Sequence, residues 1–404
     1  MKKTRILFYS HDSFGLGHFR RSLTIASFLV RHIKGLSVLM LTGLDSAASF
    51  EAPRGVDFVK LPSIWKAGPD QYQTRHLRVS FARVHRMRAQ LVRDVVRAFD
   101  PMLFVVDNVP LGVDAELMPT LKYLKKKRPH VRIVLTMRDV LDTPDHICPR
   151  WREIGVYDAL EDFYDEIWIA GCRALFDPVT LYQFPPRVAR RARFCGYVVR
   201  SVTPGETVYL RKQFRLEGAP VVVASCGGGG DGYPLLDAFA GAARPLAADG
   251  IRSVVFLGPD MPPEQRRDLK ERLLPLSEYV TTFDYRPDLV AFLDLASATV
   301  SMAGYNTTCE LVAMRKRAAV VPRVYPRFEQ LLRAQAFERH GLMRVVHPDV
   351  LDAGELEGAV RCCLEEANEG SAADLPEGVD FAGLSRITRR VRKHLELEQK
   401  GDEG

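Results

Sequence analysis

One pattern, which runs twice along this 404-residue sequence, constrains the fold more than any other feature. Short apolar runs alternate with stretches long enough for helices, and each series opens with an apolar run that leads into a glycine-bearing turn. Strands separated by helix-length segments predict βαβ units and a parallel sheet. Because the pattern restarts, we predict an α/β fold with two parallel-sheet halves rather than one large sheet.

The two series place the predicted elements as follows. In the first, strands are expected at 5–10, 36–43, 56–62, 103–108, 132–137, 166–171 and 193–199, with helices at 18–32, 74–98 and 112–127. In the second, strands are expected at 221–226, 253–258, 279–285, 298–303 and 318–323, with helices near 233–249, 262–274, 287–295, 306–315 and 326–340.

The apolar rhythm is lost between residues 199 and 218, and we place the domain boundary there. The predicted domains are residues 1–199, residues 200–380, and a basic C-terminal helix with a tail at 381–404. Packing of that helix against the first half is favoured over a helix that only lies on the surface.

Composition narrows the class of protein. The seven cysteines include no CxxC pair, which argues against a disulfide framework or a zinc site and for a reducing compartment. The apolar run near the N-terminus is short and is interrupted by His11 and Asp12, so we do not interpret it as a signal peptide. No apolar stretch approaches the roughly 18 residues of a membrane helix. We therefore expect a soluble, cytoplasmic protein.

Charge is distributed unevenly along the chain. Residues 1–200 carry a net charge of +12, whereas residues 201–404 carry −5. A basic half is compatible with nucleic acid, an anionic membrane face, an acidic substrate, or a solvated surface with no partner. Because the sequence contains no nucleic-acid-binding signature, we expect no nucleic acid partner.

The first glycine turn lies in HDSFGLGHFR (11–20), directly after the predicted strand 5–10. Backbone N–H groups at a helix N-terminus point outward without partners, so a glycine-rich turn at this place favours an anion. Gly15 and Gly17 precede His18. That histidine has two interpretations: a helix-start residue that binds main chain or a diphosphate, or the base of a catalytic site.

The second glycine turn, CGGGGDG (226–232), follows the strand VVVASC. Its four glycines, Gly227, Gly228, Gly229 and Gly230, leave the backbone able to adopt positive φ and to approach a ligand closely. The following helix brings its positive N-terminal end to the same place. The run has no P-loop lysine and is not a GxGxxG fingerprint. A phosphate cradle is favoured over an ordinary flexible turn.

Two further segments carry polar groups after predicted strands. In SMAGYNTTCE (301–310), Gly304 allows a turn, Asn306 or Thr307 can cap a helix, and Glu310 falls in its first turn. Glu310 there either favours the helix dipole or accepts hydrogen bonds from a ribose diol. Beyond a proline-marked loop, Glu329 and Gln330 offer acceptors and donors for a polyhydroxyl ligand.

From Arg5 to about residue 365, these motifs resemble those of GT-B glycosyltransferases, most closely the MurG-like group, which transfers sugars from nucleotide diphosphates. The resemblance rests on the order and spacing of four motifs: FGLGH (14–18), CGGGGDG (226–232), AGYNTTCE (303–310) and Glu329-Gln330. It implies two Rossmann-like domains that face each other across a cleft. The sequence departs from the family at Asp12, Phe14 and Arg20-Arg21 in the first loop, and at Cys226 and Asp231 in the second.

The resemblance implies a hexosyltransferase that uses a nucleotide-diphosphate sugar, UDP-linked at the level of the family, and neither a metal nor a separate cofactor. N–H groups of the tetraglycine run and of the helix after Gly304 would stabilise the leaving diphosphate. The donor-binding residues are then Gly15, Gly17, Gly227, Gly228, Gly229, Gly230, Gly304, Tyr305, Asn306, Thr307, Glu310, Glu329 and Gln330.

For catalysis, His18 is the candidate base because a neutral imidazole is available at pH 7. Asp107, at the end of the strand LFVVDN, is the candidate that orients the imidazole, as in a dyad found in some GT-B enzymes. Asp12 competes for either role. A direct displacement with one base predicts inversion of the anomeric centre.

Two other functions stay open. A nucleotide-sugar 2-epimerase uses the same scaffold but needs several acidic or basic groups around the sugar, and the cluster here is sparse. A binding protein without catalysis is the third hypothesis.

The acceptor is a glycan, a lipid-linked molecule or a small metabolite, and a protein acceptor also stays open. The segment 74–99 is predicted to place its arginines on one helical face and its apolar residues on the opposite one; the arginines are Arg75, Arg78, Arg86 and Arg93, and the apolar residues are Leu77, Val84, Leu91 and Val95. The arginine face contacts either an acceptor or anionic lipid at the inner membrane face, or it contacts only solvent. The solvated face is slightly favoured.

Overall fold

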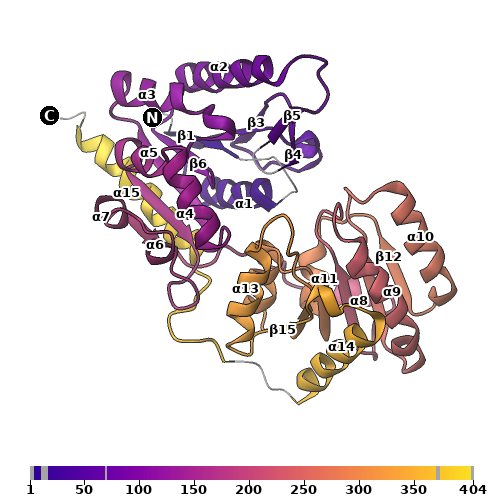
Figure 1. Cartoon of the computed structure of the whole chain (residues 1–404). Coiled ribbons are helices and arrows are strands. Elements are labelled where there is room, and N and C mark those ends of the chain that lie inside the picture. The colour runs from indigo at the N-terminus through magenta and orange to yellow at the C-terminus, as the bar shows by residue number, and fades with distance from the viewer. Residues whose placement is uncertain (1–3, 11–16, 69–70, 370–373, 402–404) are drawn as a thin grey trace. The chain divides into compact units, whose positions relative to one another are not determined.

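The computed structural model describes residues 4–10, 17–68, 71–369 and 374–401 (Figure 1). The chain divides into two compact units. Unit 1 consists of Met1–Val198 and Asp380–Gly404, and unit 2 of Val199–Val379. Each unit contains one parallel sheet covered by helices, so the predicted α/β fold with two parallel sheets is confirmed.

Unit 1 contains a seven-stranded sheet in the order β3-β2-β1-β6-β7-β8-β9. Every neighbouring pair is parallel. Its inner strands are apolar on both faces, as expected where helices cover a parallel sheet on both sides. The strands are β1 (Thr4–Tyr9), β2 (Leu36–Thr42), β3 (Val56–Lys60), β6 (Leu103–Asp107), β7 (Arg132–Arg138), β8 (Glu166–Ala170) and β9 (Ala192–Phe194).

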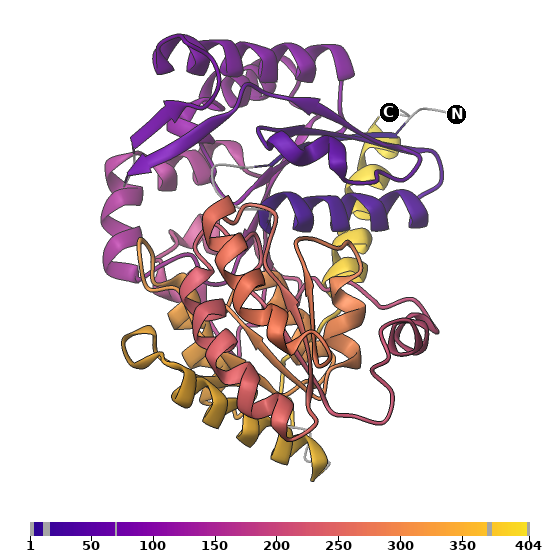
Figure 2. The same cartoon turned by 90° about the vertical axis from the view of Figure 1, so that its right-hand side faces the viewer.

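The helices of unit 1 are α1 (Gly17–His32), α2 (Phe81–Phe99), α3 (Met118–Lys127), α4 (Pro144–Glu153), α5 (Val156–Phe163), α6 (Pro178–Leu181), α7 (Pro186–Ala189) and α15 (Gly383–Gly401). Helix α15, yellow in Figures 1 and 2, packs beside α1 although it ends the chain. Arg392 donates to the carbonyl oxygen of His32 over 2.8 Å, and Arg390 lies 3.2 Å from Glu166. The C-terminal helix therefore packs against the first half, as the sequence favoured.

Unit 2 contains a six-stranded parallel sheet in the order β12-β11-β10-β13-β14-β15. The strands are β10 (Val221–Ser225), β11 (Arg252–Phe256), β12 (Val280–Phe283), β13 (Ala298–Ser301), β14 (Ala318–Val320) and β15 (Arg344–Val345). The helices are α8 (Glu206–Gln213), α9 (Tyr233–Ala248), α10 (Pro263–Leu273), α11 (Leu289–Leu295), α12 (Tyr305–Ala313), α13 (Glu329–Glu338) and α14 (Ala353–Asn368).

The predicted helix over 74–98 is wrong at its beginning. Strands β4 (Ile64–Gly68) and β5 (Gln71–Thr74) pair antiparallel and are called the hairpin below, and α2 begins only at Phe81. Ser80 ends the preceding loop in an extended conformation, which an N-cap residue requires. Arg75, Leu77 and Arg78 therefore lie in a loop, and they do not share a helical face with the arginines of α2.

A buried ion pair joins α2 to Glu116, in the segment before α3, and Tyr9 at the end of β1 is hydrogen-bonded to it. Arg88 of α2 donates from Nε and Nη2 to the two oxygens of Glu116, both over 2.7 Å, and Tyr9 donates its hydroxyl to the same carboxylate. Glu116 and Tyr9 are fully buried, and only 3 % of the Arg88 side chain is exposed. Burial raises the pKa of Tyr9, and the negative charge of Glu116 raises it further.

We predict that Arg88→Ala lowers the free energy of unfolding of unit 1 by about 3–5 kcal/mol, because it leaves the Glu116 charge buried without a cation. The three tryptophans, Trp65, Trp151 and Trp168, all lie in unit 1, so their fluorescence during urea unfolding reports on that unit. The exposed Arg86 on the same helix is the control, and Arg86→Ala should change the value by less than about 0.5 kcal/mol. Equal effects of the two substitutions would contradict the role of the ion pair.

Candidate active site

The candidate catalytic group lies where the strand order of unit 1 reverses. Strands β1 and β6 are neighbours, although β2 and β3 extend the sheet on one side and β7 to β9 on the other. Ligands of open parallel sheets bind outside the carboxyl ends of the strands at such a reversal. Asp107 is the last residue of β6, and His18 is in the first turn of α1, the helix that follows β1. The topology therefore brings two predicted site residues to one point.

His18 and Asp107 are in direct contact. Nδ1 of His18 lies 2.6 Å from Oδ2 of Asp107, and Arg21, one turn further along α1, donates to Oδ1 of the same carboxylate. Asp107 is fully buried, while 13 % of the His18 side chain is exposed. A buried carboxylate between two such partners keeps its charge and fixes the plane of the imidazole.

Arg138 settles the tautomer of His18 from the other side of the ring. Its Nη2 lies 3.3 Å from Nε2 of His18. A guanidinium can only donate and a carboxylate can only accept, so Nδ1 carries the proton and the lone pair of Nε2 accepts from Arg138. A neutral imidazole with its lone pair on Nε2 is the tautomer that a general base requires, and an acceptor hydroxyl would have to take the place of Arg138 at that atom.

The pKa shifts of the pair agree with this geometry. Burial lowers the pKa of His18, Arg138 adds to the effect, and Asp107 only partly opposes it. Burial alone would raise the pKa of Asp107, but Arg21 and His18 outweigh it and hold the pKa of this carboxyl well below its ordinary value. At neutral pH the pair is therefore a carboxylate and a neutral imidazole.

The rest of the first glycine turn is described only in part. Gly17 is the first residue of α1 and is exposed. Asp12 and Gly15, the other predicted site residues of this turn, lie outside the described residues.

In unit 2, three of the predicted segments follow three adjacent strands. The order β10-β13-β14 places the tetraglycine turn, the turn at Gly304 and the loop 321–328 side by side at the carboxyl edge of the sheet. Ser225 at the end of β10 pairs in register with Ser301 at the end of β13, and Ser301 pairs with Val320 of β14. The first of these turns also lies at the reversal of strand order, between β10 and β13.

The tetraglycine turn has two roles along its length. Gly229 has a φ of +92°, and a Cβ there would lie 2.5 Å from the carbonyl oxygen of Leu257 and 3.0 Å from Cα of Gly258. Close packing against the loop after β11 therefore requires that glycine. Gly227 has a φ of +68° with no neighbour within 4 Å of a Cβ, and Gly230 has none closer than 3.9 Å. The backbone at these two glycines is open to a ligand.

Gly304 is open in the same way. It is the N-cap of α12 with φ −66° and ψ 140°, a conformation that any residue adopts, and no atom lies within 4 Å of an added Cβ. Its neighbours inside the protein do not require a glycine. Together with the first N–H groups of α12, this space fits an anionic group at a helix N-terminus.

The sequence placed the start of α12 one residue late and assigned its cap wrongly. The helix begins at Tyr305 with Gly304 as N-cap, so Asn306 and Thr307 lie inside the first turn, and no side chain caps the helix. Glu310 lies in the second turn and not the first, and its buried position, with 3 % exposed, is not explained by the helix dipole.

Glu310 is held by an arginine that sequence reasoning missed. Arg200 donates from Nε to Oε1 over 2.7 Å and from Nη2 to Oε2 over 3.1 Å. This two-pronged contact fixes the plane of the carboxylate. A carboxylate has about four acceptor positions, so two remain after the arginine for a ligand such as a diol.

Glu329 and Gln330 are the first two residues of α13 and are buried. Arg323 lies 3.0 Å from Glu329 and 3.0 Å from Asp231 of the tetraglycine turn. It therefore connects the turn after β10 to the loop after β14. A second arginine, Arg333, is buried in α13 and donates to the carbonyl oxygen of Ala303 over 3.0 Å, which connects α13 to the turn at Gly304.

Of these arginines, only Arg21 gave a local signal. It stands three residues after His18, a spacing that places both on one face of a helix. Arg138, Arg200, Arg323 and Arg333 follow strands or lie in helices with no motif around them. Within the described ranges, no group of three or more histidine, cysteine, aspartate or glutamate side chains is arranged to hold a metal ion.

The sequence of unit 2 matches a known family. Residues 228–377 match the glycosyltransferase family 28 C-terminal domain. A curated relative, the UDP-N-acetylglucosamine--N-acetylmuramyl-(pentapeptide) pyrophosphoryl-undecaprenol N-acetylglucosamine transferase of Exiguobacterium sp., is 26 % identical over 176 residues. That match covers 42 % of this chain and 48 % of the relative, so the chain spans about half the length of the curated relative it matches.

Solved glycosyltransferases share the fold of the whole chain. MurG of Acinetobacter baumannii superposes with a TM-score of 0.61 at 9 % identity over 96 % of this chain and 99 % of its own. The calicheamicin glycosyltransferase CalG4 gives 0.61 at 16 % identity, over 98 % and 99 % of the two chains. A UGT transferase from Siraitia grosvenorii in complex with UDP gives 0.55 at 17 % identity, over 96 % and 100 %. The chain thus shares the GT-B fold of these structures, and within unit 2 residues 228–377 are similar to the family 28 C-terminal domain.

The sequence motifs lead us to expect a nucleotide diphosphate at this turn, and UDP is the probe for it. We predict that Gly304→Ala weakens UDP binding by about tenfold or more, because the new methyl group would occupy the open space beside the turn. The fold should tolerate it: the poorer N-cap costs under about 1 kcal/mol and the stiffer unfolded chain offsets part of that. Calorimetric titration with UDP and urea unfolding measure the two effects. Gly358→Ala, at an exposed site in α14, is the control, and it should leave UDP affinity unchanged.

Proposed function

We propose that this protein is a glycosyltransferase that transfers a hexose from a UDP-linked donor to an acceptor hydroxyl, with His18 as the general base. The observation that carries the proposal is the contact of 2.6 Å between His18 and the buried Asp107 at the strand reversal of unit 1. The family 28 match of residues 228–377 supports a nucleotide-sugar donor for unit 2. The Exiguobacterium relative is named as a transferase that uses UDP-N-acetylglucosamine, and the Siraitia structure is a complex with UDP, which together support UDP as the nucleotide.

In the proposed reaction, the acceptor hydroxyl displaces Arg138 from Nε2 of His18. Nε2 then removes the proton of that hydroxyl while the hydroxyl oxygen attacks the anomeric carbon. The bond between that carbon and the diphosphate oxygen breaks, and UDP leaves with the electron pair. Asp107 stabilises the imidazolium that forms, because its negative charge lies beside Nδ1 of the protonated ring. A single displacement of this kind inverts the anomeric centre, and it needs no group beyond those named.

Donor binding falls to unit 2 in this proposal. Backbone N–H groups would donate hydrogen bonds to the diphosphate and stabilise the charge that develops on it; they belong to the open glycines Gly227, Gly230 and Gly304 and to the start of α12. Glu310, held by Arg200, would accept hydrogen bonds from the ribose diol. Glu329 and Gln330 would contact the sugar hydroxyls.

The pKa of His18 sets the expected pH profile. Because that pKa lies below the usual 6.5, kcat/KM should rise with pH through a value below 6.5 and level off by pH 7. His18→Ala should lower kcat by about 10²- to 10⁴-fold and remove the acid limb of the profile. Asp107→Asn removes a charge that raises the pKa of His18, so its acid limb should move to lower pH. Release of UDP from UDP-N-acetylglucosamine is a suitable assay, with water or an added acceptor.

The control is His32→Ala, at the exposed far end of α1, which should retain the profile of the unsubstituted protein. A His18→Ala variant with an unaltered acid limb would show that another group is the base.

We further propose that the acceptor lies at, or is carried by, an anionic membrane surface that unit 1 contacts. Large apolar side chains are exposed on the hairpin, on the loop after it and on α2: Trp65, Leu77, Val79 and Met87. Arginines 75, 78 and 86 accompany them and are exposed too. Apolar side chains among cations suit the boundary of an anionic membrane. No helix of the described residues is both long and apolar enough to cross a bilayer, so this contact would be peripheral.

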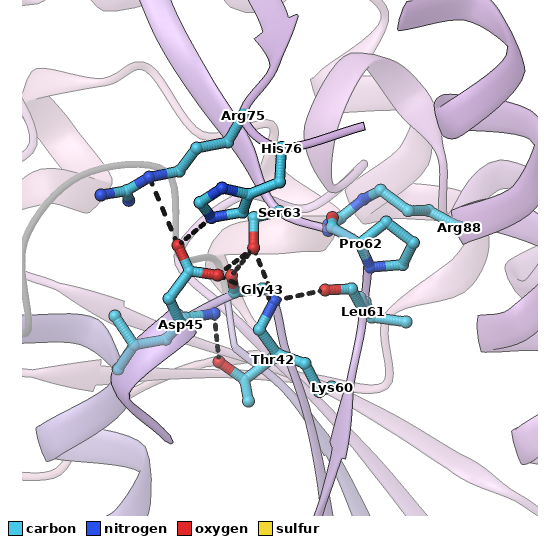
Figure 3. Close-up of polar contacts among 11 residues, drawn as sticks. Thr42, Gly43, Asp45, Lys60, Leu61, Pro62, Ser63, Arg75, His76 and Arg88 are labelled. Carbon is cyan, nitrogen blue, oxygen red and sulfur yellow. Dashed lines mark hydrogen bonds and ion pairs between the residues drawn. The ribbon is translucent and has the colours of Figure 1, made fainter. Parts of the chain in front are cut away.

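The base of this hairpin is anchored by the carboxylate of Asp45 (Figure 3). His76 lies 2.9 Å from it, Arg75 3.3 Å and Lys60 3.2 Å, and Ser63 donates its hydroxyl to it. Burial opposes ionisation, but these contacts outweigh it and lower the pKa of Asp45 to about 2. Residues on both sides of the hairpin therefore converge on one anchor, which supports a preformed contact surface.

We predict that the double variant Trp65→Ser with Leu77→Ser lowers partitioning into vesicles that contain anionic lipid by about tenfold or more, since burying one large apolar side chain contributes about 1.5–3 kcal/mol. Cosedimentation at low and high salt measures it, and the cationic contribution should weaken as salt rises. Val208→Ser with Tyr209→Ser, at exposed apolar positions of α8 in unit 2, is the control. Equal partitioning into zwitterionic vesicles, insensitive to salt, would contradict the anionic contact.

A further inference from the structure

Arg323 joins two carboxylates that come from different loops. Its Nη1 lies 3.0 Å from Oδ2 of Asp231, in the tetraglycine turn, and its Nη2 lies 3.0 Å from Oε1 of Glu329, at the start of α13. The exposed fractions of the three side chains are 17 % for Arg323, 34 % for Asp231 and 8 % for Glu329. One guanidinium therefore fixes the position of Glu329 relative to the turn that we propose for the diphosphate.

The backbone of the same residue orients Gln330. The N–H of Arg323 donates to Oε1 of Gln330 over 2.9 Å. A backbone N–H can only donate, so the amide oxygen must face it, and the NH₂ group of Gln330 is directed elsewhere. The side chain of Arg323 thus holds the carboxylate of Glu329, which accepts hydrogen bonds, and its backbone N–H orients the amide group of Gln330, whose NH₂ donates them.

A carboxylate beside an amide NH₂ is complementary to two neighbouring hydroxyl groups of a pyranose ring. One hydroxyl donates to the carboxylate, and the other accepts from the amide. The match depends on the direction of each hydroxyl, so a fixed pair discriminates between epimers, and a mobile pair does so less well. Glu329 and Gln330 are both largely buried, so their orientation depends on the groups packed around them.

We infer that Arg323 is a positioning residue for the sugar half of the donor: by holding Glu329 and Gln330 it sets which hexose the protein selects. The inference rests on the proposed function and adds the residue that determines sugar selectivity. Two tasks of unit 2 then depend on different residues. Nucleotide binding depends on the glycine turns and Glu310, and sugar selection depends on Arg323.

The test compares Arg323→Gln with the unsubstituted protein in calorimetric titrations with UDP, UDP-N-acetylglucosamine and its 4-epimer, UDP-N-acetylgalactosamine. Loss of a charged hydrogen bond predicts about a 10- to 100-fold weaker affinity for the preferred sugar nucleotide. The affinity for UDP should change by less than about twofold, and the ratio between the two epimers should move toward one. Arg323→Lys keeps the charge but not the fork, and it should recover part of the loss.

Arg327→Gln removes a cation from the same loop, has no role in our account, and is the matched control. A double variant with Glu329→Gln tests whether Arg323 acts through Glu329. If it does, Arg323→Gln should add little to the sugar-nucleotide loss already caused by Glu329→Gln.

The outcomes that would overturn the inference differ from the one that would overturn the proposed function. Equal weakening of UDP and of the sugar nucleotides would show that Arg323 acts on the diphosphate or on folding, and so would full additivity with Glu329→Gln. An unsubstituted protein that binds neither UDP nor any sugar nucleotide would overturn the proposed function itself. An unsubstituted protein that binds both epimers equally would overturn only the selectivity that we assign to Arg323.

Discussion

Pairs of arginine and carboxylate organise both candidate sites of this protein. Asp107 is paired with Arg21, Glu310 with Arg200 and Glu329 with Arg323, and in each pair the carboxylate is buried. A buried carboxylate without a partner would be neutralised or would destabilise the fold, so each of these acids requires its cation. The fork of a guanidinium also fixes direction, which a lysine ammonium does not. The same contacts therefore offset the cost of burying each carboxylate and fix its orientation.

The parallel sheets supply position, and the arginines supply orientation. In unit 1 the strand reversal between β1 and β6 brings His18 and Asp107 together, and in unit 2 the neighbours β10, β13 and β14 align three turns at one edge. Strand order alone fixes the place of each turn, but it leaves the rotation of a side chain undetermined. Arg200 fixes the rotation of the Glu310 side chain, and Arg323 fixes those of Asp231 and Glu329, at nitrogen–oxygen distances of 2.7–3.1 Å.

Much of this could be predicted from the sequence, because the relevant signals are local. Apolar runs placed the inner strands to within a few residues, and the glycine turns marked the carboxyl edges of the two sheets. The association of His18 with Asp107 followed from one rule about strand ends. The spacing of Arg21 from His18 places them on one helix face, but it does not pair Arg21 with Asp107, which is 86 residues away. Arg200 and Glu310 are 110 residues apart, and Asp231 and Arg323 are 92 apart. Arg323 and Glu329 are only six apart, but the loop between them has no regular period. No sequence period connects such pairs. The helix predicted to begin at 74 has another cause. Alternating arginines and apolar residues imitate a helical face, but Thr74 belongs to β5, which pairs with β4, and α2 begins only at Phe81.

The central claim is that a neutral imidazole, held by Asp107, drives a single displacement at the anomeric carbon. Proton NMR of the sugar released from α-linked UDP-N-acetylglucosamine, recorded before the free sugar equilibrates, tests it most directly. The account predicts that the first product, whether formed with water or with an acceptor, has the β configuration. An α-configured product would contradict a single displacement, and accumulation of the 2-epimer of the sugar would show that the protein is an isomerase and not a transferase.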